Sequence, residues 1–210
     1  MLALALVSAG AAAWAAGASA AEAATTDPGA PGRFGRQGSV SLSVERLFGL
    51  SHASQSSGPS TTTVSLMGSS GLELGVAPYG VPRIGVDGFL GHGLSLGLAG
   101  LFAVVDQNST TVTVLGLNPR VGYAVHASDG LSLWPRLGLS YVNIGASSNQ
   151  PFTQGQSAYA LAATIELQVV VTPLPRVGFL VAPTFDVGLA GTNSDKVTQI
   201  GLQAGLMAWF

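Results

Sequence analysis

The stretch from Val177 to Leu189, VGFLVAPTFDVGL, alternates between two kinds of side chain. Its odd positions are apolar, while its even positions are small or polar except for Leu180. Successive side chains of a β-strand point to opposite faces, so the stretch predicts a strand with one continuous apolar face. Residues 157–171 have the same pattern, with apolar side chains at the odd positions from Tyr159 to Val171. Together they indicate neighbouring strands rather than amphipathic helices.

The composition indicates a membrane protein. Of the 210 residues only 9% are charged, 29 are Gly, and the mean hydropathy is +0.46, whereas a soluble domain is about one quarter charged. Beyond the N-terminal leader, no apolar run is long enough for a transmembrane helix, which leaves a closed barrel as the membrane-spanning solution. The net charge of −2 argues against nucleic acid as a partner, and the lack of Cys excludes a lipid-anchored Cys, a disulfide framework and a thiolate metal site.

The first 23 residues predict a cleavable signal peptide. They are almost entirely Ala, Leu, Val and Gly and end in small residues that suit signal peptidase, at Ala18-Ser19-Ala20 or Ala21-Glu22-Ala23. No Lys or Arg follows Met1, which we interpret as a true start further upstream; a permanent membrane anchor is the alternative. Residues 24–38, rich in Pro and Gly, predict a flexible lead-in, and residues 39–210 predict the barrel.

Alternating segments separated by turn residues predict eight antiparallel strands. Short and longer joints alternate between them, as in the periplasmic turns and external loops of an outer-membrane barrel, with the chief external loop at residues 51–75. Residues 61–67 can add a strand to the first hairpin. Five prolines fall within the predicted strands, at Pro78, Pro82, Pro119, Pro135 and Pro183, and we expect bulges near strand ends to accommodate them. The predicted strands are 39–50, 76–90, 94–105, 111–126, 131–144, 157–171, 177–190 and 197–210.

The register set by the apolar residues sends the charged side chains inward. Most of them share one depth, so they predict a layer of ion pairs across the interior. The layer is interpreted as an ionic plug that fills the lumen, because an eight-stranded barrel has room only for side chains; a gate or proton path is the alternative. Arg46 is the exception, predicted to face lipid and to need a bulge or snorkelling. The predicted lumen network is Glu45, Arg83, Asp87, Arg120, Arg136, Glu166 and Asp186.

Outward aromatic residues fall in two bands, as expected where aromatic rings gather at the headgroups on both sides of a membrane. The band predicted at the external ends comprises Phe48, Phe102, Tyr141 and Tyr159, and the periplasmic band comprises Tyr123, Phe179 and Phe210.

The last strand ends in Phe210, and alternate residues back to Ile200 are apolar. This pattern resembles the C-terminal signal that the barrel-assembly machinery reads in bacterial outer-membrane proteins, except that Ala208 stands where an aromatic residue is usual. With the strand count and the segment from Pro82 to Asp87, residues 39–210 resemble the small OmpA- and OmpX-type barrels. The resemblance implies residence in the outer membrane, surrounded by lipid and lipopolysaccharide, with a structural or adhesive role. We expect a monomer.

Three histidines, His52, His92 and His126, are the candidate catalytic residues, and their spacings predict no metal site. The sequence His126-Ala127-Ser128 is similar to the His-x-Ser pair of lipid A deacylases, which act from the outer leaflet. Here the pair falls at a periplasmic turn beside Asp129, the wrong side for that substrate. We therefore predict a non-enzymatic barrel that needs neither cofactor nor metal. A lipid-modifying barrel enzyme and a narrow gated channel are the alternatives.

Overall fold

The computed structural model describes residues 34–56, 58, 60–66, 78–107, 110–128, 130–148, 156–192 and 195–210. The predicted signal peptide, residues 24–33 of the lead-in and Asp129 lie outside these residues, as do parts of the predicted external loops. In this part of the chain no helix is both long enough and apolar enough to cross a membrane.

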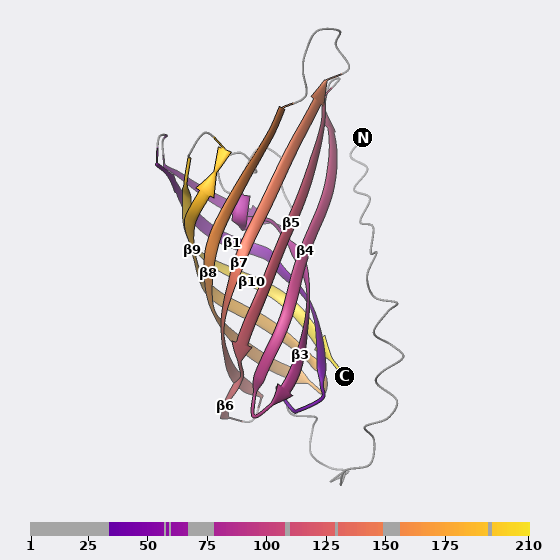
Figure 1. The fold of residues 1–210 in the computed structure, drawn as a ribbon. Helices are drawn as coiled ribbons and strands as arrows, with labels where there is room; N and C mark the ends of the chain where they lie inside the picture. Colours follow the sequence, from indigo (N-terminus) through magenta and orange to yellow (C-terminus); the bar gives the residue numbers. More distant parts are fainter. Residues whose placement is uncertain are drawn as a thin grey trace.

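The described residues form one closed antiparallel sheet, drawn in Figure 1. Eight strands make the ring in the order β1, β3, β4, β5, β7, β8, β9 and β10, and the pairing of β10 with β1 closes it. The short strand β6 follows β5 after Ala124, and both pair with β7. The bounds are β1 Val40–Gln55, β2 Thr61–Leu66, β3 Arg83–Gly91, β4 Leu94–Gln107, β5 Thr110–Tyr123, β6 Val125–Ser128, β7 Leu131–Ser148, β8 Gln156–Leu174, β9 Val177–Gly191 and β10 Val197–Trp209.

The ring confirms the predicted all-β, up-and-down barrel of eight strands. One predicted strand, 76–90, is shorter than expected, because Pro78–Gly80 form the 3-10 helix η2 and β3 begins only at Arg83. Pro78 and Pro82 have no backbone N–H to contribute to a ladder, which explains the late start. The extra strand expected on the first hairpin is present as β2, which pairs with Phe48–Ala53 of β1.

Three prolines remain within ring strands, but they interrupt hydrogen-bonded ladders instead of forming the expected bulges. Pro119 is paired with Leu98 of β4 and lies in an interruption of the β5–β7 ladder. Pro183 is paired with Leu202 of β10 and lies in an interruption of the β8–β9 ladder. Pro135 is paired with β8 and lies beyond the last β5–β7 pair. Each proline therefore lies beside one interrupted ladder, where no backbone N–H is required from it.

The two faces of the wall have opposite chemistry. On β9, Phe179 points outward and is 50% exposed, whereas the next residue, Leu180, points inward and is 2% exposed. The same strand turns Phe185 outward and buries Asp186. Large apolar side chains cover the outside of the other strands as well, and polar or charged side chains fill the middle of the inside. This inversion of a soluble core is the arrangement of a transmembrane barrel.

The lumen contains three layers of side chains. The end that holds the short turns after β3, β6 and β8, called here the turn end, is filled by aromatic and other apolar residues. Charged residues form the middle layer. The opposite end, called the loop end, is filled by small apolar residues and by Tyr79 of η2, which is 3% exposed. The turn end corresponds to the predicted periplasmic side of the barrel.

Candidate functional site, an ionic layer across the lumen

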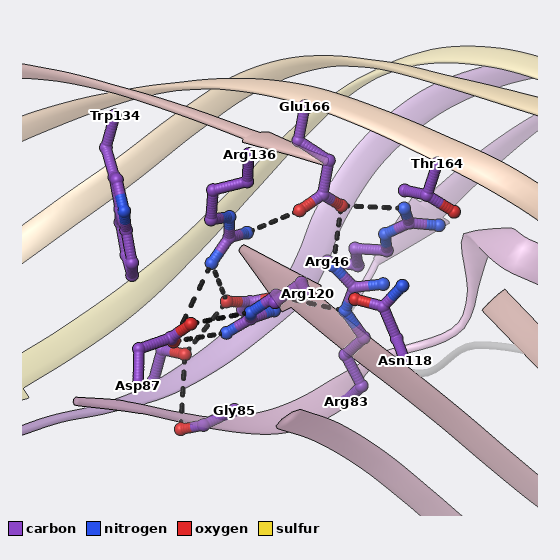
Figure 2. Close-up of polar contacts among 12 residues, drawn as sticks. Arg46, Arg83, Gly85, Asp87, Asn118, Arg120, Trp134, Arg136, Thr164 and Glu166 are labelled. Carbon is purple, nitrogen blue, oxygen red and sulfur yellow. Dashed lines mark hydrogen bonds and ion pairs between the residues drawn. The ribbon is translucent and has the colours of Figure 1, made fainter. Parts of the chain in front are cut away.

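Eight charged side chains meet in the middle of the lumen, and each is 8% exposed or less. They come from six strands of the ring, so the layer joins walls that are distant in the sequence. The four cations match the four anions in number, which leaves the layer without net formal charge. Figure 2 shows most of its members converging from opposite walls. The members are Arg46, Arg83, Arg120 and Arg136 with Glu45, Asp87, Glu166 and Asp186.

Glu45 of β1 is the centre of one half of the layer. Its carboxylate accepts hydrogen bonds from Arg83 Nε at 2.9 Å and from the Nη1 atoms of Arg120 and Arg136, each at 2.7 Å. Ser43 Oγ donates a fourth bond at 2.9 Å. Charge-assisted hydrogen bonds of this length are the strong ones, and here they satisfy a carboxylate that is 2% exposed.

Glu166 of β8 is the centre of the other half. It accepts bonds from Arg83 at 2.5 Å, from Arg136 at 2.6 Å and from Arg46 at 2.8 Å. Because Arg83 and Arg136 bind both glutamates, the halves form one network across the barrel. Breaking one buried pair would leave charges without partners, which costs about 3–5 kcal/mol.

Asp87 and Asp186 anchor the two sides of the layer. Asp87 receives a bidentate pair from Arg120, with Nε to Oδ1 at 2.8 Å and Nη2 to Oδ2 at 2.5 Å. Asp186 accepts a bond from Arg46 at 3.3 Å and another from the hydroxyl of Thr164 at 2.6 Å. All seven residues that the sequence predicted for the lumen network therefore lie together inside the barrel.

The prediction that Arg46 faces lipid was wrong, because its side chain points into the lumen and is 2% exposed, but the bulge named as one way to accommodate it is present. The β1–β10 register shifts between Val44 and Phe48, and Arg46 has a φ of 58°. This bulge makes two consecutive residues, Glu45 and Arg46, face inward. The left-handed backbone of one residue costs about 1–2 kcal/mol of stability. An Arg side chain that faces lipid at mid-depth costs more, about 2–4 kcal/mol.

Inward-facing glycines make room for the layer. A Cβ built on Gly85 would meet Arg120 Nη2 and the Ser43 hydroxyl, and one built on Gly97 would meet the Asp87 carboxylate. A Cβ on Gly122 would lie 2.5 Å from Trp134 Nε1. Alternation of small and large residues lets side chains fill a narrow barrel. From the sequence, these glycines can be assigned to the predicted inward face. The side chains for which they make room lie on other strands, so the sequence does not identify them.

The layer can fill and brace the barrel, but its described geometry offers little to a substrate. Each carboxylate is engaged by one or more guanidinium groups, and Thr164, Ser140 and Asn118 continue the network through hydrogen bonds of 2.6 and 3.1 Å. Among the residues placed by the structure, no group of three His, Cys, Asp or Glu side chains could hold a metal ion. The arrangement fits the predicted plug.

An apolar layer at the turn end includes a residue of the predicted flexible lead-in, Phe34. Phe34 is 3% exposed and packs with Phe89, Trp134 and Trp209, so residues 34–38 belong to the folded barrel. The available signal was one aromatic residue inside a stretch of Gly, Pro and Arg. It was missed because the socket that holds Phe34 is assembled from three distant strands.

The structure places the His-x-Ser sequence and the other two histidines at different sites. His126 and Ser128 lie on β6 at the turn end, and His126 Nδ1 is 3.0 Å from the hydroxyl of Ser132 on β7. His52 Nδ1 is 2.9 Å from the hydroxyl of Thr62 on β2, and His92 is in the β3–β4 turn with a φ of 50°. The His126–Ser132 contact is a cross-strand hydrogen bond near a turn.

The outward aromatic residues occupy two bands. Phe102 and Tyr159 are 43% and 44% exposed toward the loop end, and Tyr141 stacks on Tyr159 with ring centroids 6.4 Å apart. Phe48 is 38% exposed but lies near the middle of β1, two residues after Arg46, and not at its external end. At the turn end, Tyr123, Phe179 and Phe210 are 49–71% exposed. These exposures agree with the predicted girdles, since aromatic rings at both edges of an apolar band favour the headgroup regions of a membrane.

No protein-family model matches the sequence, and the search of curated proteins gave no match either. Solved structures do match. Neisserial surface protein A is similar over 82% of this chain and 99% of its own, with 15% identity and a TM-score of 0.53. Ail, the attachment invasion locus protein of Yersinia pestis, matches over 81% and 99% with 12% identity and a TM-score of 0.46. The N-terminal barrel of Pseudomonas aeruginosa OprF matches over 83% and 98%, with 12% identity and a TM-score of 0.45.

The closed ring of eight strands, its inverted faces and the likeness to Neisserial surface protein A agree with one another. The chain therefore has the fold of the small eight-stranded β-barrels of bacterial outer membranes.

Proposed function

We propose that the protein resides in the bacterial outer membrane as a closed barrel that braces the envelope or presents its loop end for surface contact, without catalysing a reaction or conducting ions. The observation that carries the proposal is the ionic layer. Eight buried charges bind one another across the lumen, while the outer face of the same strands is apolar. Lipid and lipopolysaccharide are the surroundings that such an outer face requires.

The length of the strands supports a role outside the membrane. A tilted strand crosses the hydrocarbon in about 9–11 residues, whereas β7 has 18 residues and β8 has 19. The excess lies partly at the loop end, where β2 also extends the first hairpin along β1. A rigid β-structure raised above the bilayer is a suitable platform for contacts with other surfaces. The β1–β10 pairing closes the ring without a second copy, which supports a monomer.

The proposal is tested by expressing the full chain in a Gram-negative host, separating the membranes, and adding the purified protein to planar bilayers. We expect it to sediment with the outer membrane, to migrate differently on gels before and after heating, and to give no conductance. Recovery in soluble or inner-membrane fractions, or regular current steps from the wild type, would overturn the proposal.

Catalysis needs a separate test. Lipid A incubated with the folded protein and examined by mass spectrometry should keep its mass, and the Ser128→Ala variant should behave like the wild type. Loss of an acyl chain with the wild type alone would establish the enzymatic alternative.

A further inference from the structure

The lumen is blocked a second time at the turn end, below the ionic layer. Phe89 of β3, Trp134 of β7 and Trp209 of β10 point inward there and are each 4% exposed or less. Val170 of β8, Leu180 of β9 and Met207 of β10 belong to the same cluster. The members of this aromatic layer have aromatic or aliphatic side chains, including the Met207 thioether, so its chemistry is unlike that of the layer above it.

Phe34 lies at the centre of the aromatic layer although it precedes the first strand. Its ring centroid is 5.0 Å from that of Phe89, 5.1 Å from Trp134 and 5.6 Å from Trp209, with interplanar angles of 82°, 69° and 73°. Edge-to-face contacts of this kind are the favoured aromatic geometry. One side chain therefore bridges three walls of the barrel.

The backbone that follows Phe34 is fixed to β3. Gly38 N–H donates to the Phe89 carbonyl at 2.8 Å, and Phe89 N–H donates to the Ser39 carbonyl at 2.9 Å. The Ser39 hydroxyl closes a turn by donating to the Arg36 carbonyl at 2.6 Å.

Two glycines allow this turn. Gly35 and Gly38 have φ values of 83° and 79°, which favour glycine. A Cβ on Gly35 would lie 2.8 Å from Ala124 Cβ, at the point where β5 and β6 are separated. The segment 34–39 therefore packs against the wall where β5 is followed by β6.

We propose that residues 34–39 form a periplasmic seal that acts in series with the ionic layer, so that either barrier alone keeps the lumen closed. The inference rests on the closed barrel proposed above. An ion crossing the barrel needs a continuous hydrated path. The ionic layer occupies that path with paired charges, and the aromatic layer excludes water by its apolar surface, which is how hydrophobic constrictions block channels.

The seal is tested by opening each layer separately and then together. The ionic layer is opened with the charge-neutral double variant Arg83→Ser/Glu166→Ser, which removes bonds that join its two halves. Each remaining charge keeps a partner: Arg46 pairs with Asp186, Arg120 with Asp87, and Arg136 with Glu45. Arg136 is left in place because its guanidinium lies 4.6 Å from the Trp134 ring and so contacts both layers. The aromatic layer is opened with Phe34→Ala. Its control is Phe179→Ala, which removes an outward ring at the same end.

The full chain carrying each variant is refolded, checked for heat-modifiable migration, and added to planar bilayers. All these variants, and the protein they are compared with, carry Tyr79→Ala, because Tyr79 is 3% exposed in the apolar layer that fills the loop end. In that background we expect Phe34→Ala and the ionic double variant to be silent, and their combination to give regular current steps. The ionic double variant combined with Phe179→Ala should stay silent. A conducting ionic double variant, or a folded combination that remains silent, would overturn the seal. Conductance of the wild type would instead overturn the proposed function.

A second readout tests the aromatic layer without measuring current. Trp14 is first replaced by Phe, so that Trp134 and Trp209 are the remaining tryptophans, and their fluorescence is excited selectively. Iodide added to the folded protein should quench Phe34→Ala more strongly than Phe179→Ala, because only the first uncovers the two buried indoles. Equal quenching in the two variants would count against the seal.

Discussion

Gly85 lies on the inward face of β3, beneath the guanidinium of Arg120, and Gly88 lies three residues further along on the outward face. A Cβ at Gly85 would collide with the charged layer, whereas one at Gly88 would meet no atom within 4 Å. The two positions share a strand and a residue type but differ in their surroundings, which makes them a matched pair.

We expect Gly85→Ala to lower the free energy of unfolding by about 1–3 kcal/mol, the usual cost of overpacking a filled interior. Gly88→Ala should change it by less than about 0.5 kcal/mol. Guanidinium unfolding in lipid vesicles, followed by Trp fluorescence, measures both. Equal effects would show that the lumen around Arg120 is not packed as described.

At the scale of the element, β10 pairs with β1 and is followed by Phe210, whose side chain is exposed. Phe210 N–H donates to the Val40 carbonyl at 3.0 Å, so the backbone helps to close the ring. Its side chain is 71% exposed and adds little to the packing of the wall. We propose that the barrel-assembly machinery reads the phenyl group of Phe210 during biogenesis, as the assembly signal predicted from the sequence.

Phe210→Ala should therefore reduce the amount of protein in the outer membrane several-fold in cells. Its unfolding midpoint after refolding in vitro should stay close to that of Phe179→Ala, because each variant loses one outward ring of the same aromatic girdle. Quantitative blots of membrane fractions and vesicle unfolding give the two numbers, with Phe179→Ala as the control. Normal membrane levels for Phe210→Ala would refute the assembly role.

At the scale of the whole molecule, the inverted arrangement can be measured directly because the chain has no cysteine. Leu139 and Ser140 are neighbours on β7, and Leu139 is 48% exposed whereas Ser140 is 4% exposed. A spin label on Leu139→Cys should collide freely with oxygen dissolved in lipid, because the side chain faces the hydrocarbon. A label on Ser140→Cys should be protected from both oxygen and a polar nickel reagent, because that side chain lies in the filled lumen. The opposite ranking would contradict the fold.

The sequence by itself determined the eight-stranded ring, its inward and outward faces and the seven lumen charges, because a period of two assigns each side chain to one face once the register is set. It did not determine the direction of Arg46, the late start of β3 or the use of the prolines, because a bulge and a ladder interruption depend on the neighbouring strand. Nor did it reveal the place of Phe34. Its socket exists only after β3, β7 and β10 have closed around it, so contacts among residues far apart in the chain decided that a segment resembling a linker belongs to the core.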